Sequence, residues 1–168
     1  MAYQDHVRDA DPIRARCAVI TLSDTRTRET DKSGRKIRDL LESQNHVVAR
    51  YELIPDDVSA LHTLLTELCA THDLDAIVTN GGTGISRRDT TIEVVETHLD
   101  QTLPGFGELF RMLSWQEIGS GAMLSRAVAG VARGKLLFAM PGSTGAVELA
   151  MTKLILPELK HLVHEMRK

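Results

Sequence analysis

Residues 76–84 read Ala-Ile-Val-Thr-Asn-Gly-Gly-Thr-Gly, a short apolar run that passes directly into a glycine-rich loop. A short apolar run bounded by turn residues is typical of a buried strand in a parallel sheet. In open α/β sheets, ligands bind beyond the carboxyl ends of the strands, where this loop begins. Glycine lets the backbone approach a ligand closely, and the loop's N–H groups and threonine hydroxyls suit an anion. From spacing alone, a ligand-binding loop and a plain glycine-rich turn are equally well supported.

The segments around this loop alternate between expected strands and expected helices. Strands are predicted at 17–22, 47–53 and 76–79, with two more within 127–140 on either side of Arg133-Gly134. Helices are predicted from residue 37, over 58–68, after residue 90, within 103–126 and after residue 143. This alternation indicates a mainly parallel sheet with helices on both faces, a three-layer α/β/α architecture. We expect residues 1–14 to form a polar N-terminal arm and residues 15–168 to form a single domain.

Two local signals concern the ends and continuity of helices. Thr90-x-x-Glu93 has the form of a capping box, in which the Thr90 side chain bonds to the first helical turn. Pro157 lies inside the last predicted helix. We expect a kink or break there, because proline lacks the N–H donor that a helix interior uses.

The composition argues against several classes of function. Of the 168 residues, 42% are hydrophobic and 26% are charged, as in ordinary globular proteins. A net charge of −3 and an aromatic content of 4% argue against binding to nucleic acid. No apolar run approaches the ~20 residues of a membrane helix, and the polar N-terminus resembles no secretory signal. Cys17 and Cys69 lie in apolar segments as expected core residues, which favours a reducing cytoplasm.

Two carboxylates near predicted strand ends are the candidate catalytic and metal-binding residues. Asp56 follows the second strand, and Asp89 follows the glycine-rich loop. Ionised carboxylates are ligands that Mg²⁺ prefers. The alternative is structural, because Asp56 or Asp57 would cap the helix from Val58 and Asp89 would favour the start of the next helix. The residues by themselves favour this structural alternative.

Ser23-Asp24 and Pro141-Gly142-Ser143 are expected at the same edge of the sheet as the glycine-rich loop. Ser23-Asp24 ends the first strand, and Ser125 and Pro141-Gly142-Ser143 lie near later strand boundaries. Together with the glycine-rich loop they suit a phosphorylated ligand, although a single serine is more often a turn or cap residue. The glycines follow neither the G-x-G-x-x-G nor the Walker A spacing, and the seven histidines form no metal-ligand set.

Taken together, seven segments resemble the MoaB/MogA family of molybdenum cofactor biosynthesis proteins, over about residues 15–160. In order, they are Leu22–Asp24, Ile54–Asp56, Thr79–Gly84, Arg88–Thr91, Pro104–Glu108, Leu124–Arg126 and Pro141–Ser143. The resemblance implies that the ligand is molybdopterin, a pterin with a dithiolene and a terminal phosphate. It also implies transfer of AMP from Mg-ATP to that phosphate, and assembly as trimers or hexamers.

The resemblance carries roles over by position. Asp56 and Asp89 match the family's two functional acidic residues, which implies that they bind Mg²⁺ and orient the reacting phosphates. Contacts to nucleotide or pterin fall on Ser23, Asp24, Thr79, Gly81, Gly82, Thr83, Gly84, Ser125, Pro141, Gly142 and Ser143. Arg87 or Arg88 either adds positive charge to the site or lies at the surface.

Three functional hypotheses follow from this resemblance. The leading one is a cytoplasmic molybdopterin adenylyltransferase that uses Mg²⁺ and ATP. The short segment after Pro157 is similar to compact B-type members, and it favours the alternative of a non-catalytic protein that binds and carries molybdopterin. The third hypothesis is a structural oligomer with a relict site.

Overall fold

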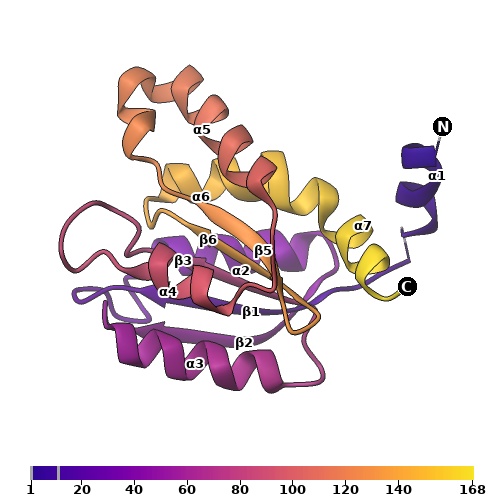
Figure 1. Ribbon diagram of the computed structural model, residues 1–168, viewed down its shortest axis with the longest axis horizontal. Helices are drawn as coiled ribbons and strands as arrows, with labels where there is room; N and C mark the ends of the chain where they lie inside the picture. Colours follow the sequence, from indigo (N-terminus) through magenta and orange to yellow (C-terminus); the bar gives the residue numbers. More distant parts are fainter. Residues whose placement is uncertain (1, 11) are drawn as a thin grey trace.

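A computed structural model describes residues 2–10 and 12–168 and has a six-stranded sheet at its centre (Figure 1). The strand order is β2-β1-β3-β6-β5-β4. The parallel strands are β2 (Val47–Ile54), β1 (Arg16–Leu22), β3 (Ala76–Asn80) and β6 (Lys135–Met140). Antiparallel pairs add β5 (Val128–Ala132) next to β6 and β4 (Gln101–Thr102) next to β5. The predicted, mainly parallel sheet is confirmed, and β4 is an additional two-residue strand that no periodicity predicts.

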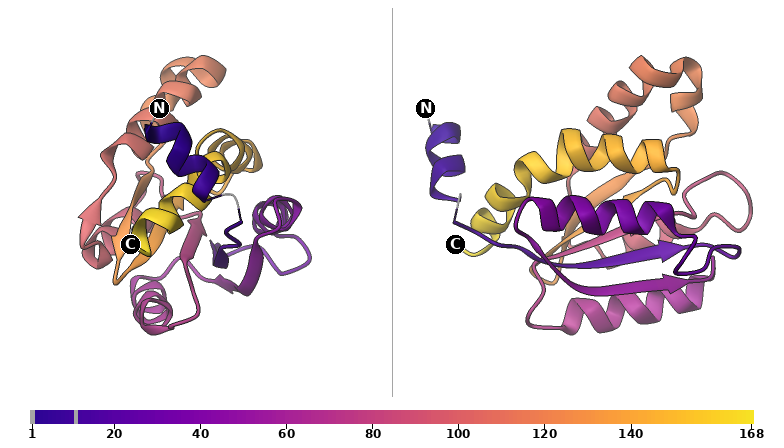
Figure 2. Two further views of the ribbon diagram at one scale, coloured as in Figure 1. Left: turned by 90° about the vertical axis from the view of Figure 1, so that its right-hand side faces the viewer. Right: turned by 180° about the vertical axis from the view of Figure 1, so that it is seen from behind.

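Helices cover both faces of the sheet, which confirms the three-layer architecture (Figure 2). One face carries α3 (Val58–Ala70) and α4 (Thr91–His98). The other face carries α2 (Lys32–Ser43), α5 (Pro104–Ile118), α6 (Thr144–Ala150) and α7 (Leu156–Met166). The right-hand view of Figure 2 shows α3 below the sheet and α2, α6 and α7 above it.

These two layers explain why the central strands are mostly apolar. Successive side chains of a strand point to opposite faces of the sheet. In β1, Cys17 and Val19 therefore pack under the α2 side, while Ala18 and Ile20 pack under the α3 side. Every residue of β3 and β6 is buried in the same way. Cys17 and Cys69 are both buried and unbridged, as expected.

The strand register brings four strand ends to one edge of the sheet. Leu22 pairs with Ile54, Thr21 with Asn80, and Asn80 with Met140. The residues that directly follow these strands are Ser23, Pro55, Gly81 and Pro141. The loops that carry most of the candidate site residues therefore begin side by side.

The start of α2 and the cap of α4 differ from the prediction. α2 begins at Lys32, five residues before Ile37, because the buried Asp31 caps it by accepting a hydrogen bond from Gly34 N (2.9 Å). Thr90 does precede α4, but its side chain makes no capping hydrogen bond. The predicted capping box is therefore wrong, and Glu93 instead pairs with Arg126.

The chain passes Pro157 without a break. A π-helical turn, η2 (Met151–Ile155), joins α6 to α7 and absorbs the irregularity expected there. Pro157 is the second residue of α7, and its missing N–H falls directly after the π-helical turn, where the regular i→i−4 pattern is already interrupted.

Part of the predicted N-terminal arm is helical. α1 (Ala2–Asp9) lies beside α7, where the Tyr3 hydroxyl donates to Glu158 in the first turn of α7 and the Tyr3 ring makes an edge-to-face contact with His161. Within the described ranges, no helix is both long enough and apolar enough to cross a membrane.

Candidate functional site

A cleft of about 550 Å³ opens at the edge where the four parallel strands end. Its walls come from the loops after these strands and from the end of the 3₁₀ turn η1 (Gly119–Leu124). The predicted site residues that line it are Ser23, Asp24, Asp56, Gly81, Gly82, Thr83, Gly84, Asp89, Ser125, Pro141 and Gly142. Leu22, Thr25, Arg26 and Leu124 complete the lining.

Two of the predicted site residues lie outside this cleft. Thr79 is fully buried within β3, and its hydroxyl has no hydrogen-bond partner among the described residues. Ser143 caps α6, because its Oγ accepts a hydrogen bond from Ala146 N (3.2 Å), and it lines a neighbouring cleft. Ser143 thus has the capping role that serines near turns commonly have.

The glycines of the loop after β3 make room for the two candidate carboxylates. Gly82 has a φ of +64°, and a Cβ there would lie 2.8 Å from Asp56 Oδ1 and 2.4 Å from Thr91 Oγ1. A Cβ at Gly84 would lie 2.6 Å from Asp89 Oδ2. Gly81 has a φ of +97°, and its N–H donates to Met140 O at 3.1 Å. The Gly81 amide therefore ties β3 to β6 rather than pointing at a ligand.

Asp56 carries an unusual carboxyl group. Its Oδ1 is buried and has no hydrogen-bond partner among the described residues. Burial raises the pKa of Asp56, the negative charges of Asp24 and Asp89 raise it further, and Arg88 and Arg26 act in the opposite direction. A buried acceptor without a partner, repelled by two like charges, favours binding of a cation.

Asp24 and Arg88 hold Asp56 in place from the neighbouring loops. Asp24 Oδ1 accepts a hydrogen bond from Asp56 N (3.1 Å), and Asp24 Oδ2 lies 2.7 Å from Arg88 Nη2. Arg88 Nη2 also donates to the Asp56 carbonyl at 3.2 Å. Of the two arginines considered from the sequence, Arg88 is therefore the one attached to the site.

The structural alternative for the carboxylates applies to Asp57 and, in part, to Asp89. Asp57 Oδ1 accepts from Ala60 N (2.8 Å) and caps α3, which leaves Asp56 without a capping role. Asp89 Oδ2 closes its own turn by accepting from Ser86 N (3.0 Å) and Ser86 Oγ (2.6 Å). Asp89 still lines the cleft together with Asp56.

The carboxylates fit a Mg²⁺ ion that arrives with a phosphate ligand. Across the described part of the chain, no three His, Cys, Asp or Glu side chains are grouped to hold a metal ion by themselves. Mg²⁺ commonly uses only one or two carboxylates, and takes its other ligands from water and substrate phosphates. Asp56, with its unpartnered Oδ1, and Asp89 satisfy that smaller requirement.

Arg26 is a lining residue that the sequence did not reveal. It lies in the polar stretch between β1 and α2, which carries no recognisable motif. Its backbone N–H donates to Ser23 Oγ at 3.1 Å, so that the loop turns back over the strand end. The one feature of the sequence that could have indicated Arg26 is its position, three residues after Ser23 at the carboxyl edge of the sheet.

Comparison with known sequences gives matches over nearly the whole chain. A family model described as "Probable molybdopterin binding domain" matches residues 18–161. Molybdenum cofactor biosynthesis protein B of Halalkalibacterium halodurans is 53% identical over 169 aligned positions, which cover 100% of this chain and 99% of that protein. The protein of the same name from Bacillus subtilis is 52% identical, with coverage of 100% and 99%.

Solved structures agree with these matches. A crystal structure of molybdenum cofactor biosynthesis protein B superposes with a TM-score of 0.90 at 52% identity, covering 93% of this chain and 98% of that one. The tungsten cofactor synthesizing protein MoaB from Pyrococcus furiosus superposes with a TM-score of 0.83 at 36% identity, covering 94% and 99%.

Proposed function

The chain belongs to the family of molybdenum cofactor biosynthesis B proteins, which carry a molybdopterin-binding domain, and from this premise we propose that it is a cytoplasmic molybdopterin adenylyltransferase. In the proposed reaction, an oxygen of the terminal phosphate of molybdopterin forms a bond to the α-phosphorus of ATP. The bond from that phosphorus to the β-phosphate oxygen breaks, and pyrophosphate leaves. The observation that carries the proposal is Asp56, whose buried and unpartnered Oδ1 lies in the same cleft as Asp89 and the glycine-rich loop.

Charge is the main obstacle to this reaction, because both reactants are anionic. Bound together with ATP, Mg²⁺ supplies charge neutralisation at the phosphate oxygens. Asp56 and Asp89 are the residues proposed to hold that ion. The N–H groups of residues 82–84 make no hydrogen bond within the described part of the protein, which supports a role in anion binding. Phosphoryl transfer of this kind needs little proton transfer, so that no histidine is required.

The proposal is tested by measuring pyrophosphate release from Mg-ATP with and without molybdopterin. The wild-type protein is expected to release pyrophosphate over many turnovers only when molybdopterin is present. D56N and D89N are expected to fold normally and to lose at least ~100-fold in turnover, as expected when stabilisation of transition-state charge is removed. D57N is the matched control, because it removes a charge next to Asp56 outside the cleft and keeps an oxygen that caps α3.

Two results would contradict the proposal. Full activity in both D56N and D89N would refute the assigned roles. Tight binding of molybdopterin without any pyrophosphate release would instead support a non-catalytic molybdopterin carrier.

We also propose that the chain self-associates, as trimers or hexamers. Support comes from large apolar side chains that are exposed along α5 and η1. They are Leu109, Met112, Trp115, Ile118, Met123 and Leu124.

A further inference from the structure

The charges that line the cleft are unbalanced for a ligand that carries phosphate. Asp24, Asp56 and Asp89 supply three carboxylates. Among the described lining residues, the guanidinium of Arg26 is the one permanent cation. Arg88 is outside the lining and is paired with the Asp24 carboxylate. A phosphate group entering this cleft therefore meets a single positively charged side chain on its walls.

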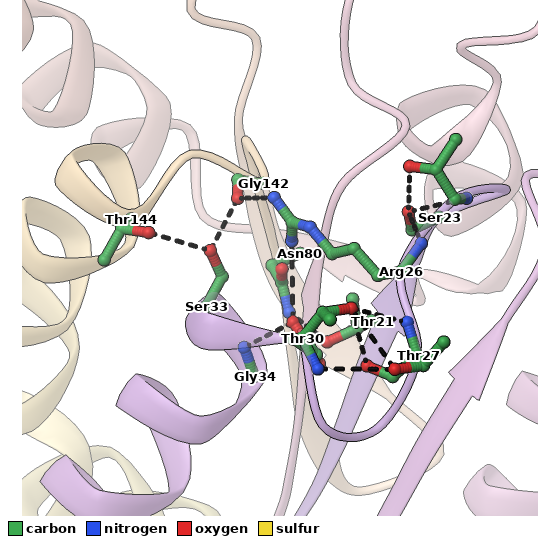
Figure 3. Close-up of polar contacts among 12 residues, drawn as sticks. Thr21, Ser23, Arg26, Thr27, Thr30, Ser33, Gly34, Asn80, Gly142 and Thr144 are labelled. Carbon is green, nitrogen blue, oxygen red and sulfur yellow. Dashed lines mark hydrogen bonds and ion pairs between the residues drawn. The ribbon is translucent and has the colours of Figure 1, made fainter.

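Arg26 is held in position by contacts from two sides. Its Nη2 donates to the Gly142 carbonyl at 2.9 Å, and its Nη1 lies 3.5 Å from Asp31 Oδ1. Figure 3 shows the side chain reaching from the loop after β1 across to Gly142. Ser33 Oγ donates to the same carbonyl at 2.7 Å, which fixes the acceptor. A guanidinium has five N–H donors, so that these two contacts leave donors for a ligand.

Asp31 is itself fixed by its surroundings. Its side chain is fully buried, and it accepts hydrogen bonds from the Tyr51 hydroxyl (2.6 Å) and from Gly34 N (2.9 Å). Burial alone would raise the pKa of Asp31, but hydrogen bonds from Tyr51, Thr21 and Gly34 and the charge of Arg26 hold it below its usual value. The carboxylate therefore stays ionised as a partner for Arg26.

Tyr51 anchors this chain of contacts at the edge of the sheet. Burial and the bond to Asp31 raise the pKa of Tyr51 to about 12, so that its hydroxyl remains a donor. The guanidinium carbons of Arg38 and Arg28 lie 4.1 Å and 4.9 Å from the centre of its ring. The ring is therefore held even when the hydroxyl is removed.

We propose that Arg26 binds a phosphate group of a substrate in this cleft, and that Asp31 and Tyr51 are positioning residues that aim it. The proposal rests on the proposed function for the presence of phosphorylated substrates. Two sources share this chemistry, namely the phosphates of the nucleotide and the terminal phosphate of molybdopterin. Because Arg presents a planar fork to phosphate oxygens, lysine at this position restores the charge without the paired donors.

Calorimetric titration with inorganic pyrophosphate, Mg-ATP and molybdopterin tests the role of Arg26. R26A is expected to weaken binding of at least one of these ligands by about 10- to 100-fold, and R26K by less. Loss for Mg-ATP and pyrophosphate identifies the nucleotide phosphates, and loss for molybdopterin alone identifies the pterin phosphate. R35A is the control, because Arg35 lies nearby in the first turn of α2 but outside the lining of the cleft. Equal binding of all ligands by R26A and R35A would overturn the proposal.

The positioning role is tested with Y51F in two backgrounds. Y51F keeps the ring and removes the bond to Asp31. It is expected to raise the dissociation constant of the same ligand several-fold while the thermal midpoint changes little. In the R26A background, Y51F is expected to have no further effect on binding, since the contact it controls is already gone. Equal effects in both backgrounds would show that Tyr51 does not act through Arg26.

These results separate the two proposals. Ligand binding that depends on Arg26, without AMP transfer, would refute the adenylyltransferase and leave the role of Arg26 intact. Normal AMP transfer together with unchanged ligand binding in R26A would refute the role of Arg26 and leave the adenylyltransferase proposal intact. A wild-type protein that binds none of the three ligands would refute both.

Discussion

The ionised Asp56 side chain, which is proposed to bind a cation, is expected to lower the stability of the protein when no cation is bound. Because its pKa is raised by burial and by Asp24 and Asp89, its ionised form is less favourable in the folded chain than in the unfolded chain. D56N removes this repulsion and keeps an acceptor oxygen. In the absence of Mg²⁺ near pH 7, we expect D56N to be more stable by ~0.5 kcal/mol, or about 1–2 °C in the thermal midpoint.

The pH dependence of that gain gives a second check. A raised carboxyl pKa means that the cost is fully present at neutral pH, where the group is ionised in both states. It falls as the pH drops through the folded-state value and vanishes below the ordinary value of 3.8. Thermal melts of wild type, D56N and the control D57N over this range measure it. A gain that persists unchanged at the acid end would show that repulsion is not its cause.

Comparing alanine substitutions at Gly82 and Gly134 distinguishes backbone strain from crowding of the site. Gly82 and Gly134 both have positive φ, of +64° and +73°, where a Cβ is unfavourable by ~1–2 kcal/mol. A Cβ at Gly134 meets nothing within 4 Å, whereas at Gly82 it meets Asp56 Oδ1 and Thr91 Oγ1. G134A is therefore expected to lose stability and to keep its turnover. G82A is expected to lose more stability and also to lose turnover by at least tenfold.

Thermal melts and pyrophosphate release measured on both variants check this difference. Equal loss of turnover in G82A and G134A would mean that general destabilisation, rather than displacement of Asp56, causes the defect.

At the scale of the element, a histidine pair joins α3 to α4, the two helices that start beside Asp56 and Asp89. His98 Nε2 and His62 Nδ1 lie 3.0 Å apart, so that one nitrogen donates and the other accepts. Burial, followed by the charges of His62 and Arg133, lowers the pKa of His98 below its ordinary 6.5. The unfolded chain therefore takes up this proton at a higher pH than the folded chain does.

We expect this histidine pair to make the folded protein less stable as the pH falls. Stability falls as the pH drops from 6.5 towards the lower folded-state pKa of His98, because the unfolded state binds more protons in that window. The thermal midpoint of H98Q is expected to fall less over the same range, although the buried His46, with a lowered pKa of its own, retains part of the effect. H72Q, at an exposed position, is the control, and the idea fails if H72Q and H98Q behave alike.

Elements with strong periodicity are predictable from this sequence, and their ends are less so. The apolar runs of β1, β3 and β6 and the leucine spacing of α3 are direct consequences of burial, and the structure confirms them. The start of α2 was not predictable, because it depends on Asp31 being buried under Tyr51 from a strand 20 residues away. The Thr90 cap was predicted wrongly because Glu93 pairs with Arg126, a partner 33 residues away.

The same contrast holds for the candidate site. Residues directly after strands, such as Ser23 and Gly142, could be placed at the cleft because parallel strands end at one edge. Arg26 could not be placed at the cleft from the sequence. The orientation of its side chain depends on Asp31 and on the Gly142 carbonyl, 116 residues away. Thr79 and Ser143 fit the sequence pattern, but Thr79 is buried within a strand and Ser143 caps a helix.

At the scale of the whole molecule, α5 and η1 form an arm that rises away from the sheet (Figure 1). The exposed apolar residues of α5 recur every third position, at Leu109, Met112, Trp115 and Ile118. Trp115 is 62% exposed, which is unusual for the largest apolar side chain. The arm returns to the body at Leu124, which lines the cleft. An interface built on this arm would therefore stand next to the proposed active site.

If the chain assembles through α5 and η1, a charge placed at Trp115 should break the assembly. Trp115 is expected to be covered in the assembled protein, where an aromatic side chain of this kind commonly contributes ~2 kcal/mol or more to association. W115E is therefore expected to shift the molecule from three or six times 18.5 kDa to a single protomer in light scattering after gel filtration. Q116E introduces the same charge at the neighbouring exposed position and is expected to leave the assembly intact. Because Trp115 is the chain's one tryptophan, its fluorescence in the wild type should shift to longer wavelength on dilution as the ring becomes exposed to water. A protomer mass for the wild type, or an unchanged mass for W115E, would place any assembly on a different surface.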